Sequence, residues 1–214
     1  MLSIDISKNI VHKIKFIIFL CISLFCLGSF SQDIPLRLAF GDEATAIPYT
    51  KLFSTPFHPV VQAGTEFGYM ENSHNHLYQT ANLGYIYHKY LYQGIYLSTE
   101  LGYDYRFDFG LNLKALFGLG YLQTFAVSDE YQFKDGEYVL GKDRGNARLM
   151  PSLSIGAGYR IKPHEEHSPE VFLLYQSWLE YPYSPGFIPL MTHIDLMIGM
   201  KFFIKTSKSG RHED

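Results

Sequence analysis

Apolar and polar residues alternate along most of the chain beyond residue 57. The clearest case runs from Thr192 to Ile204, where every even position carries threonine or an apolar residue. Successive side chains of a β-strand point to opposite faces, so this alternation predicts a strand with one apolar and one polar or small face. The same pattern predicts seven strands, over residues 58–70, 77–88, 92–106, 109–125, 149–161, 169–180 and 191–205.

Such strands fit either a soluble sandwich, whose apolar face is the core, or a membrane barrel, whose apolar face meets lipid. Most of them run for about 12–15 residues, whereas about 5–6 is usual and a tilted membrane strand needs about 9–11 in lipid. The second face is rich in Gly, Ser, Glu, Arg and Lys, which suits a narrow lumen, and Tyr gathers at the strand ends, where aromatic girdles lie. The sequence therefore predicts an all-β fold, an antiparallel transmembrane β-barrel.

The connections predict the topology of this barrel. Bacterial barrels have an even number of strands, short periplasmic turns and longer extracellular loops. If the last strand ends in the periplasm, the outer connections are 181–190, 126–148 and 89–91, and the inner ones are 162–168, 107–108 and 71–76. The longest connection holds Asp135-Gly136 between two β-prone segments, which predicts a hairpin with a type I′ turn.

This topology requires an eighth strand before residue 58. Ile34–Phe40 alternates in the same way and is the segment that fits. Residues 32–57 are therefore a first strand or, as the alternative, a segment that threads, caps or tethers the barrel of residues 58–205. Residues 206–214 are expected to form a periplasmic tail.

Residues 1–31 have the pattern of a secretory signal peptide. Three lysines precede the apolar segment Phe16–Leu27, and Ser29-Phe30-Ser31 offers small residues for cleavage. The apolar segment is too short to span a bilayer as a helix, which disfavours a retained anchor. Both cysteines, Cys21 and Cys26, lie inside it, so the mature chain would have no disulfide, thiolate metal site or cysteine nucleophile.

Composition excludes several classes of protein. The 214 residues are 47% hydrophobic, 18% charged and 16% aromatic, a balance that is incompatible with disorder. The net charge of −3 gives no basic balance for nucleic acid. No Walker or redox motif appears, and we expect neither a cofactor nor a metal.

Charged residues on the second face are expected to point into the lumen. There a carboxylate beside a cation keeps both ionised, and an unpaired charge is unfavourable. We interpret these residues as wall-stabilising ion pairs, with a polar conduit as the alternative, because eight strands leave little free bore. The candidates are Glu66, Glu100, Asp104, Arg106, Lys114, Arg160, Asp195 and Lys201.

Other polar residues suggest chemistry more weakly. His193 and Asp195 share a strand face, and Ser152 or Ser154 could complete a nucleophilic site only if the strand order allowed it. Further candidates near strand ends are His58, His88 and Thr80. His164-Glu165-Glu166-His167 lacks the i, i+4 spacing of a zinc helix and lies in a Pro-flanked turn, so a solvated turn is expected. His74 and His76 are interpreted in the same way.

The predicted outer loops carry aromatic residues of the kind that anchor partners. They are Tyr131, Phe133, Tyr138, Tyr181, Tyr183 and Phe187.

The last strand carries the segment Gly199-Met-Lys-Phe202-Phe-Ile204. With the predicted architecture, it resembles the small outer-membrane β-barrel proteins of Gram-negative bacteria, the OmpA-, OmpX- and OmpW-like group. The residue usage looks like that of a Bacteroidota protein. The resemblance implies that Gly199, Phe202 and Ile204 form a barrel-assembly signal, although Met197 stands at its polar position and the chain continues beyond it. The His-x-Ser-Asn motif of the lipid A deacylase barrels is not found.

We therefore predict a non-enzymatic integral protein of the bacterial outer membrane with a structural, adhesion or envelope-complex role. Its expected partners are outer-membrane lipid, the barrel-assembly machinery and an envelope protein. The alternatives are a channel for small or apolar solutes, a lipid-modifying hydrolase and a soluble periplasmic sandwich.

Overall fold

The computed structural model describes residues 33–127, 131–134, 136–141, 143, 145–165, 167–184 and 186–205. The predicted signal peptide and the predicted tail of residues 206–214 lie outside the described residues. Among the described residues, no helix is long and apolar enough to cross a membrane.

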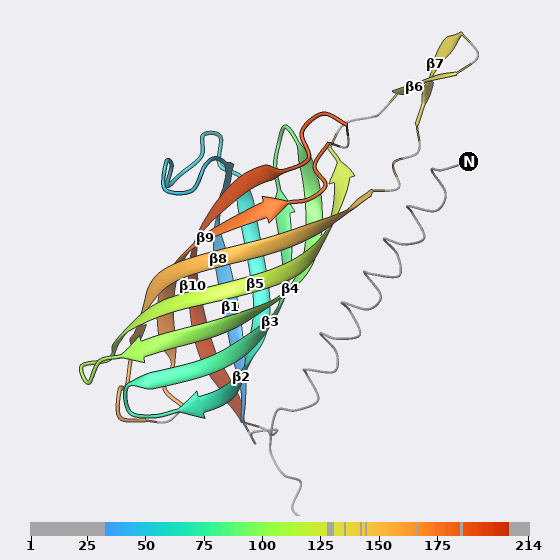
Figure 1. Ribbon diagram of the computed structural model, residues 1–214. Helices are drawn as coiled ribbons and strands as arrows, with labels where there is room; N and C mark the ends of the chain where they lie inside the picture. Colours follow the sequence, from blue (N-terminus) through green and yellow to red (C-terminus); the bar gives the residue numbers. More distant parts are fainter. Residues whose placement is uncertain are drawn as a thin grey trace, which may run out of the picture. The chain divides into compact units, whose positions relative to one another are not determined.

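Eight antiparallel strands form a closed barrel (Figure 1). They are β1 (Asp33–Thr45), β2 (Pro59–Glu71), β3 (Asn75–Tyr87), β4 (Tyr92–Arg106), β5 (Leu111–Ala126), β8 (Asn146–Arg160), β9 (Glu170–Glu180) and β10 (Met191–Lys205). Each strand pairs with its neighbour in the chain order, and β1 closes the barrel by pairing with β10. The predicted all-β eight-stranded barrel is confirmed, and the seven strands seen in the alternation lie within a few residues of their expected bounds.

The first strand, β1, is longer than the expected Ile34–Phe40. It continues through Gly41-Asp42-Glu43, where the apolar alternation stops, and stays paired with β10 as far as Thr45 opposite His193. These additional residues stay in the strand because Glu43 points into the lumen and contacts His193 on β10 there. Polar lumen contacts thus extend this strand beyond its apolar pattern.

The long connection between β5 and β8 holds the hairpin of β6 (Tyr131–Lys134) and β7 (Glu137–Leu140). Gly136 in its turn has a positive φ, which glycine adopts without strain. The hairpin predicted from Asp135-Gly136 is confirmed.

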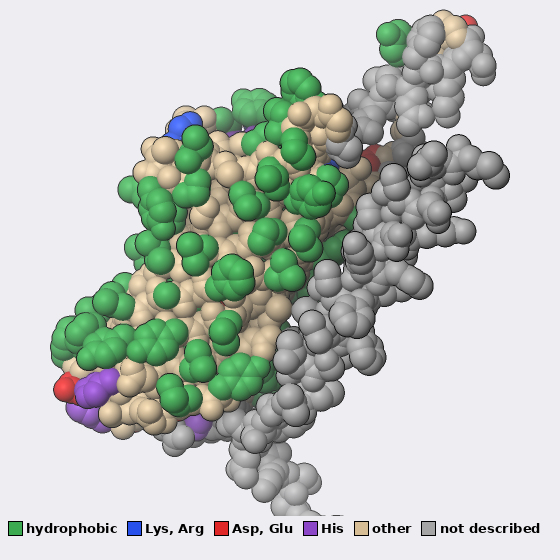
Figure 2. All heavy atoms as spheres, viewed as in Figure 1, with side chains coloured by type: hydrophobic (Ala, Val, Ile, Leu, Met, Phe, Trp, Pro, Cys, Tyr) green, Lys and Arg blue, Asp and Glu red, His purple; other side chains and the backbone are tan. Residues whose placement is uncertain are grey.

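The barrel is apolar outside and polar inside. Exposed Leu, Ile, Val, Phe and Tyr alternate along each strand with buried residues that include most of the charged side chains. Hydrophobic side chains cover the wall in Figure 2, and the charged and histidine side chains of that face lie at its ends. Since apolar surface of this extent is unfavourable in water, the exterior is the lipid-facing side and the wall contacts lipid.

Lumen glycines make room for large side chains. Gly84 on β3 lies opposite Tyr96 on β4, and a Cβ at Gly84 would overlap the Tyr96 ring. Tyr96 is buried in the apolar cluster of the lumen.

Gly84→Ala is expected to destabilise the barrel by about 1–3 kcal/mol, the usual effect of overpacking. Urea unfolding in detergent micelles measures it. Gly68→Ala is the matched control, because a Cβ there meets only the far end of His76 at 3.7 Å. Equal stability of the two variants would contradict the close packing of Gly84 and Tyr96.

Candidate functional site

A chain of ion pairs crosses the lumen near one end of the barrel. Its members come from six strands and alternate in charge: Arg37, Glu66, Lys201, Glu170, Lys114 and Asp104. The Lys114 ammonium lies 2.6 Å from Asp104 Oδ2 and 2.7 Å from Glu170 Oε1. Lys201 Nζ lies 3.0 Å from Glu66 Oε2, and Arg37 Nε lies 3.4 Å from Glu66 Oε1. All six side chains are buried, so each charge is balanced by a neighbour.

Five of the eight lumen candidates therefore take part in ion pairs. Glu66, Asp104, Lys114 and Lys201 belong to the chain just described, and Arg106, the last residue of β4, pairs with Glu71. The sequence analysis did not include Arg37 and Glu170, although both stand at lumen positions of their strands.

The other three candidates form no ion pair among the described residues, and the expectation of a cation beside each carboxylate is wrong for two of them. Glu100 accepts hydrogen bonds from the Asn82, Ser154 and Gln176 side chains instead. Asp195 is fully buried, with Gln176 as its β9 neighbour. Arg160 donates to the Glu165 backbone carbonyl. Alternation tells which side chains point inward, but the stagger of the strands decides which of them lie at the same height.

His76 also differs from the expected solvated turn. It is the second residue of β3 and has a buried, inward side chain. Its ring stacks on Tyr78, and its Nδ1 lies 4.0 Å from Asp104 Oδ2. His74 remains partly exposed in the turn, as expected.

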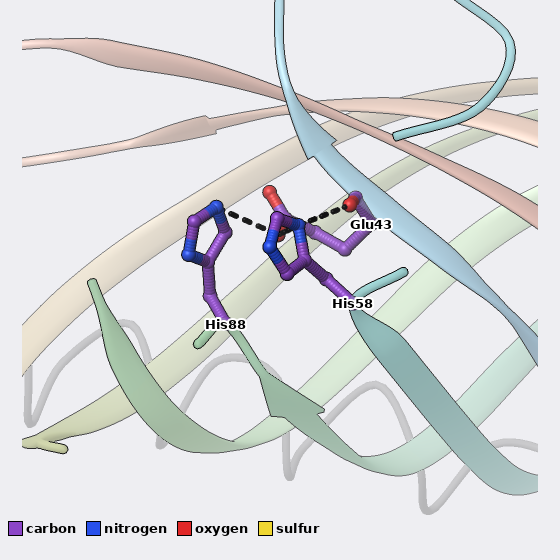
Figure 3. A group of neighbouring side chains, drawn as sticks. All are labelled: Glu43, His58 and His88. Carbon is purple, nitrogen blue, oxygen red and sulfur yellow. Dashed lines mark hydrogen bonds and ion pairs between the residues drawn. The ribbon is translucent and has the colours of Figure 1, made fainter. Parts of the chain in front are cut away.

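A second polar cluster occupies the opposite end of the lumen and is the candidate functional site. Glu43, His58 and His88 converge there from β1, from the residue before β2 and from the residue after β3 (Figure 3). Glu43 Oε2 lies 4.0 Å from His58 Nδ1 and 3.9 Å from His88 Nε2, and the two imidazole rings stack with centroids 3.6 Å apart. All three residues are buried.

His193 joins Glu43 to the rest of this cluster. Its Nδ1 lies 2.7 Å from Glu43 Oε1 and its Nε2 lies 3.1 Å from Glu180 Oε2. With a carboxylate at each nitrogen, the doubly protonated ring satisfies both contacts. Its plane stacks on Trp178 with centroids 4.1 Å apart. Arg148 Nε approaches Glu180 Oε1 at 3.2 Å from the other side.

The connection between β1 and β2 positions His58. Asp42 accepts hydrogen bonds from the backbone N–H groups of Ser54 and His58 and from Ser54 Oγ. His58 Nδ1 lies 3.1 Å from the Glu43 backbone carbonyl, which orients the ring into the lumen. The sequence analysis considered His58, His88 and His193 separately, for nucleophilic chemistry, and did not include Glu43. It could not bring them together, because these residues are far apart in the chain and follow no motif.

The described residues do not assemble a serine nucleophile with a histidine base. Both ring nitrogens of His193 face carboxylates, and Ser154 Oγ donates to Glu100. His58 Nδ1 lies 3.3 Å from Ser54 Oγ, but its Nε2 has no hydrogen-bond partner where a triad requires an acid. The cluster is better suited to binding a cation, since it offers imidazole and carboxylate ligands.

The predicted loop and assembly residues take several positions. Tyr181 and Phe187 are exposed, and so is Tyr138 on β7. The Tyr183 ring packs over the Arg148 guanidinium. The Tyr131 and Phe133 side chains lie outside the described residues. On β10, Ile204 faces outward, and a Cβ at Gly199 would overlap the Phe172 ring in the lumen.

A closed eight-stranded barrel with an apolar exterior and buried ion pairs in its lumen defines the class: this chain has the fold of a small outer-membrane β-barrel protein. Neither a protein-family model nor a curated protein matches the chain.

Solved structures of this class are similar to the chain. The N-terminal β-barrel domain of Pseudomonas aeruginosa OprF is 12% identical, with coverage of 81% of this chain and 98% of that one and a TM-score of 0.48. Neisserial surface protein A is 10% identical, with coverage of 82% and 98% and a TM-score of 0.48. The outer membrane enzyme PagL is 10% identical, with coverage of 77% and 97% and a TM-score of 0.44.

Proposed function

We propose that the protein is a non-enzymatic barrel that binds an envelope or cell-surface partner protein through the connections at the Glu43 end, which we assign to the outside of the cell. This orientation has both barrel termini in the periplasm, the arrangement expected from the loop lengths. The proposal rests on one observation: the loop of residues 46–58 is fixed to the barrel and still exposes large apolar side chains.

Several contacts fix this loop. The Tyr49 backbone N–H donates to the Tyr175 hydroxyl at 2.8 Å, and the two rings stack. Near the other end of the loop, Asp42 binds Ser54 and His58, and the Phe57 ring contacts Phe40. The loop therefore has a defined surface before any partner arrives, which lowers the entropic cost of binding.

The exposed side chains of the loop are Ile47, Tyr49, Leu52, Phe53 and Phe57, and Phe53 keeps 68% of its surface accessible. Phe187, in the neighbouring outer connection, keeps 83%. Fixed apolar groups beyond the barrel wall mark an interaction surface. Aromatic anchors of this kind carry most of the free energy in protein interfaces.

The two alternative functions have less support. A conducting lumen would require a polar solute to break the ion-pair chain that crosses it. A hydrolase would require a serine, a histidine base and an acid on the second ring nitrogen; Ser54 Oγ lies 3.3 Å from His58 Nδ1, but no described residue bonds to His58 Nε2. The barrel-assembly machinery remains a proposed partner during insertion, through Gly199, Phe202 and Ile204 on β10.

Site-specific photocrosslinking in intact cells tests the proposed binding surface. A photoreactive residue at Phe53 or Phe187 is expected to give a discrete protein adduct of higher mass. Phe117 on the lipid-facing wall and Phe109 in an inner turn are the matched controls, since both are exposed apolar positions outside the proposed surface. The proposal fails if Phe53 and Phe187 give only the lipid adducts that Phe117 gives.

A further inference from the structure

We propose that Glu43, His58 and His88 form a binding site for a divalent transition-metal ion of the zinc type. One potential ligand atom from each of the three residues lies within 4.8 Å of the others. Zinc holds ligands at about 2.0–2.2 Å, so tetrahedral ligand atoms stand about 3.3 Å apart. A small side-chain rotation that shortens the 3.9 Å contact between Glu43 Oε2 and His88 Nε2 would bring these two ligand atoms to this spacing. His58 lies beside the same carboxylate, with its Nδ1 4.0 Å from Glu43 Oε2.

Unpartnered buried atoms point to the same conclusion. Glu43 Oε2 and His58 Nε2 are both buried without a hydrogen-bond partner. Such atoms carry a free-energy penalty unless something binds them. When His58 donates its Nδ1 proton to the Glu43 carbonyl, Nε2 presents its lone pair, as metal-binding histidines do when their second nitrogen is held by a carbonyl.

The neighbouring residues hydrogen-bond the proposed ligands, as the residues around a metal site commonly do. His193 holds Glu43 Oε1 at 2.7 Å and leaves Oε2 for the ion. Ligand carboxylates in metal sites are commonly hydrogen-bonded in this way. His88 Nδ1 accepts a long hydrogen bond of 3.3 Å from the Tyr90 backbone N–H. If Nε2 binds the ion, the ring proton lies on Nδ1, which can then no longer accept this bond.

Charge also favours a cation at this end of the lumen. The buried carboxyl groups are Asp42, Glu43, Glu180 and Asp195, and among the described residues their one guanidinium partner is Arg148. The chain at the other end, in contrast, alternates evenly from Arg37 to Asp104. Buried carboxylates require pairing or a metal. A divalent ion would place positive charge beside the Glu43 carboxylate, whose Oε2 has no hydrogen-bond partner.

The ligand set indicates the kind of metal. Two imidazoles and one carboxylate suit zinc and neighbouring transition metals, whereas calcium and magnesium prefer oxygen ligands. Three protein ligands leave a position for water or for a group from outside. His58 and His88 lie next to the outer connections, which gives an ion from outside a short path. The proposed site departs from our sequence-based expectation that the protein holds no metal.

The test uses protein purified from outer membranes without a polyhistidine tag and stripped with a chelator. Calorimetry with Zn²⁺ and the visible spectrum with Co²⁺ are expected to show one site per chain. His58→Ala, His88→Ala and Glu43→Gln are each expected to weaken Zn²⁺ binding by at least about tenfold. His164→Ala, in the exposed inner connection, is the matched control and is expected to leave binding unchanged.

A gel of unboiled and boiled samples shows whether each variant is folded. Glutamine has nearly the same size as glutamate, so Glu43→Gln still tests the site if a histidine variant does not fold. Wild-type protein that takes up no Zn²⁺ or Co²⁺ overturns the proposal. Binding that survives in the folded Glu43 and His88 variants overturns it as well, because the ion would then lie elsewhere.

Discussion

Lys114→Met is expected to destabilise the folded barrel by about 3–5 kcal/mol, the usual result of removing one partner from a buried ion pair. The Lys114 side chain is 1% exposed and its ammonium contacts Asp104 and Glu170 at 2.6 and 2.7 Å. Methionine fills similar space but leaves two carboxylates close together in a lumen that water reaches poorly. Tyr78 still donates to Asp104, although one hydroxyl does not replace an ammonium.

Equilibrium urea unfolding in lipid vesicles measures this effect. The sequence has a single tryptophan, and Trp178 stacks on His193 inside the barrel, so its fluorescence reports the loss of the fold. Lys162→Met is the control, because Lys162 pairs with Glu165 on the surface and such pairs contribute about 0–1 kcal/mol.

A double variant checks the cause. Adding Asp104→Asn to Lys114→Met removes the charge of one of the two carboxylates that Lys114 contacts, while Glu170 keeps Lys201 at 3.5 Å. Part of the lost stability is therefore expected to return. If Lys114→Met unfolds at the same urea concentration as Lys162→Met, the ion-pair chain does not stabilise the lumen.

Phe117→Arg is expected to destabilise the barrel in a bilayer by about 2–4 kcal/mol, the range for arginine at the lipid midplane. Phe117 lies near the middle of β5, with Leu101 and Leu153 as its outward neighbours on β4 and β8. All three side chains are exposed on the wall. The guanidinium of the introduced arginine would therefore lie in hydrocarbon or be hydrated by water that enters the bilayer.

The same unfolding assay in vesicles measures this variant. Phe187→Arg is the control, since Phe187 lies in a connection beyond the strands and arginine there meets water. Equal stability of both variants and the wild type would mean that the barrel wall faces water, the arrangement expected of a soluble periplasmic protein. A loss confined to Phe117→Arg supports lipid as the solvent of the wall.

The barrel could be predicted from local patterns because alternation acts on each strand separately. Segments such as Thr192–Ile204 place one set of side chains outward whatever their neighbours do. The connection lengths, together with the even number of strands in bacterial barrels, then require a strand before residue 58, which is β1. The bounds of β1 could not be predicted in this way, since Gly41-Asp42-Glu43 follows no apolar pattern and pairs through the contact of Glu43 with His193.

By itself, the sequence determined the class of fold, the inward direction of residues such as Glu66 and Lys201, and the exposure of Tyr181 and Phe187 in the last connection, but not the apolar loop of residues 46–58. Only the tertiary structure decided which inward residues meet. Closure of β1 on β10 and the stagger of the strands bring Glu43, His58, His88 and His193 to one height, although they are up to 150 residues apart. Alternation has a period of two and specifies a face, whereas a binding site depends on height along the barrel, which is set by the register of all eight strands together.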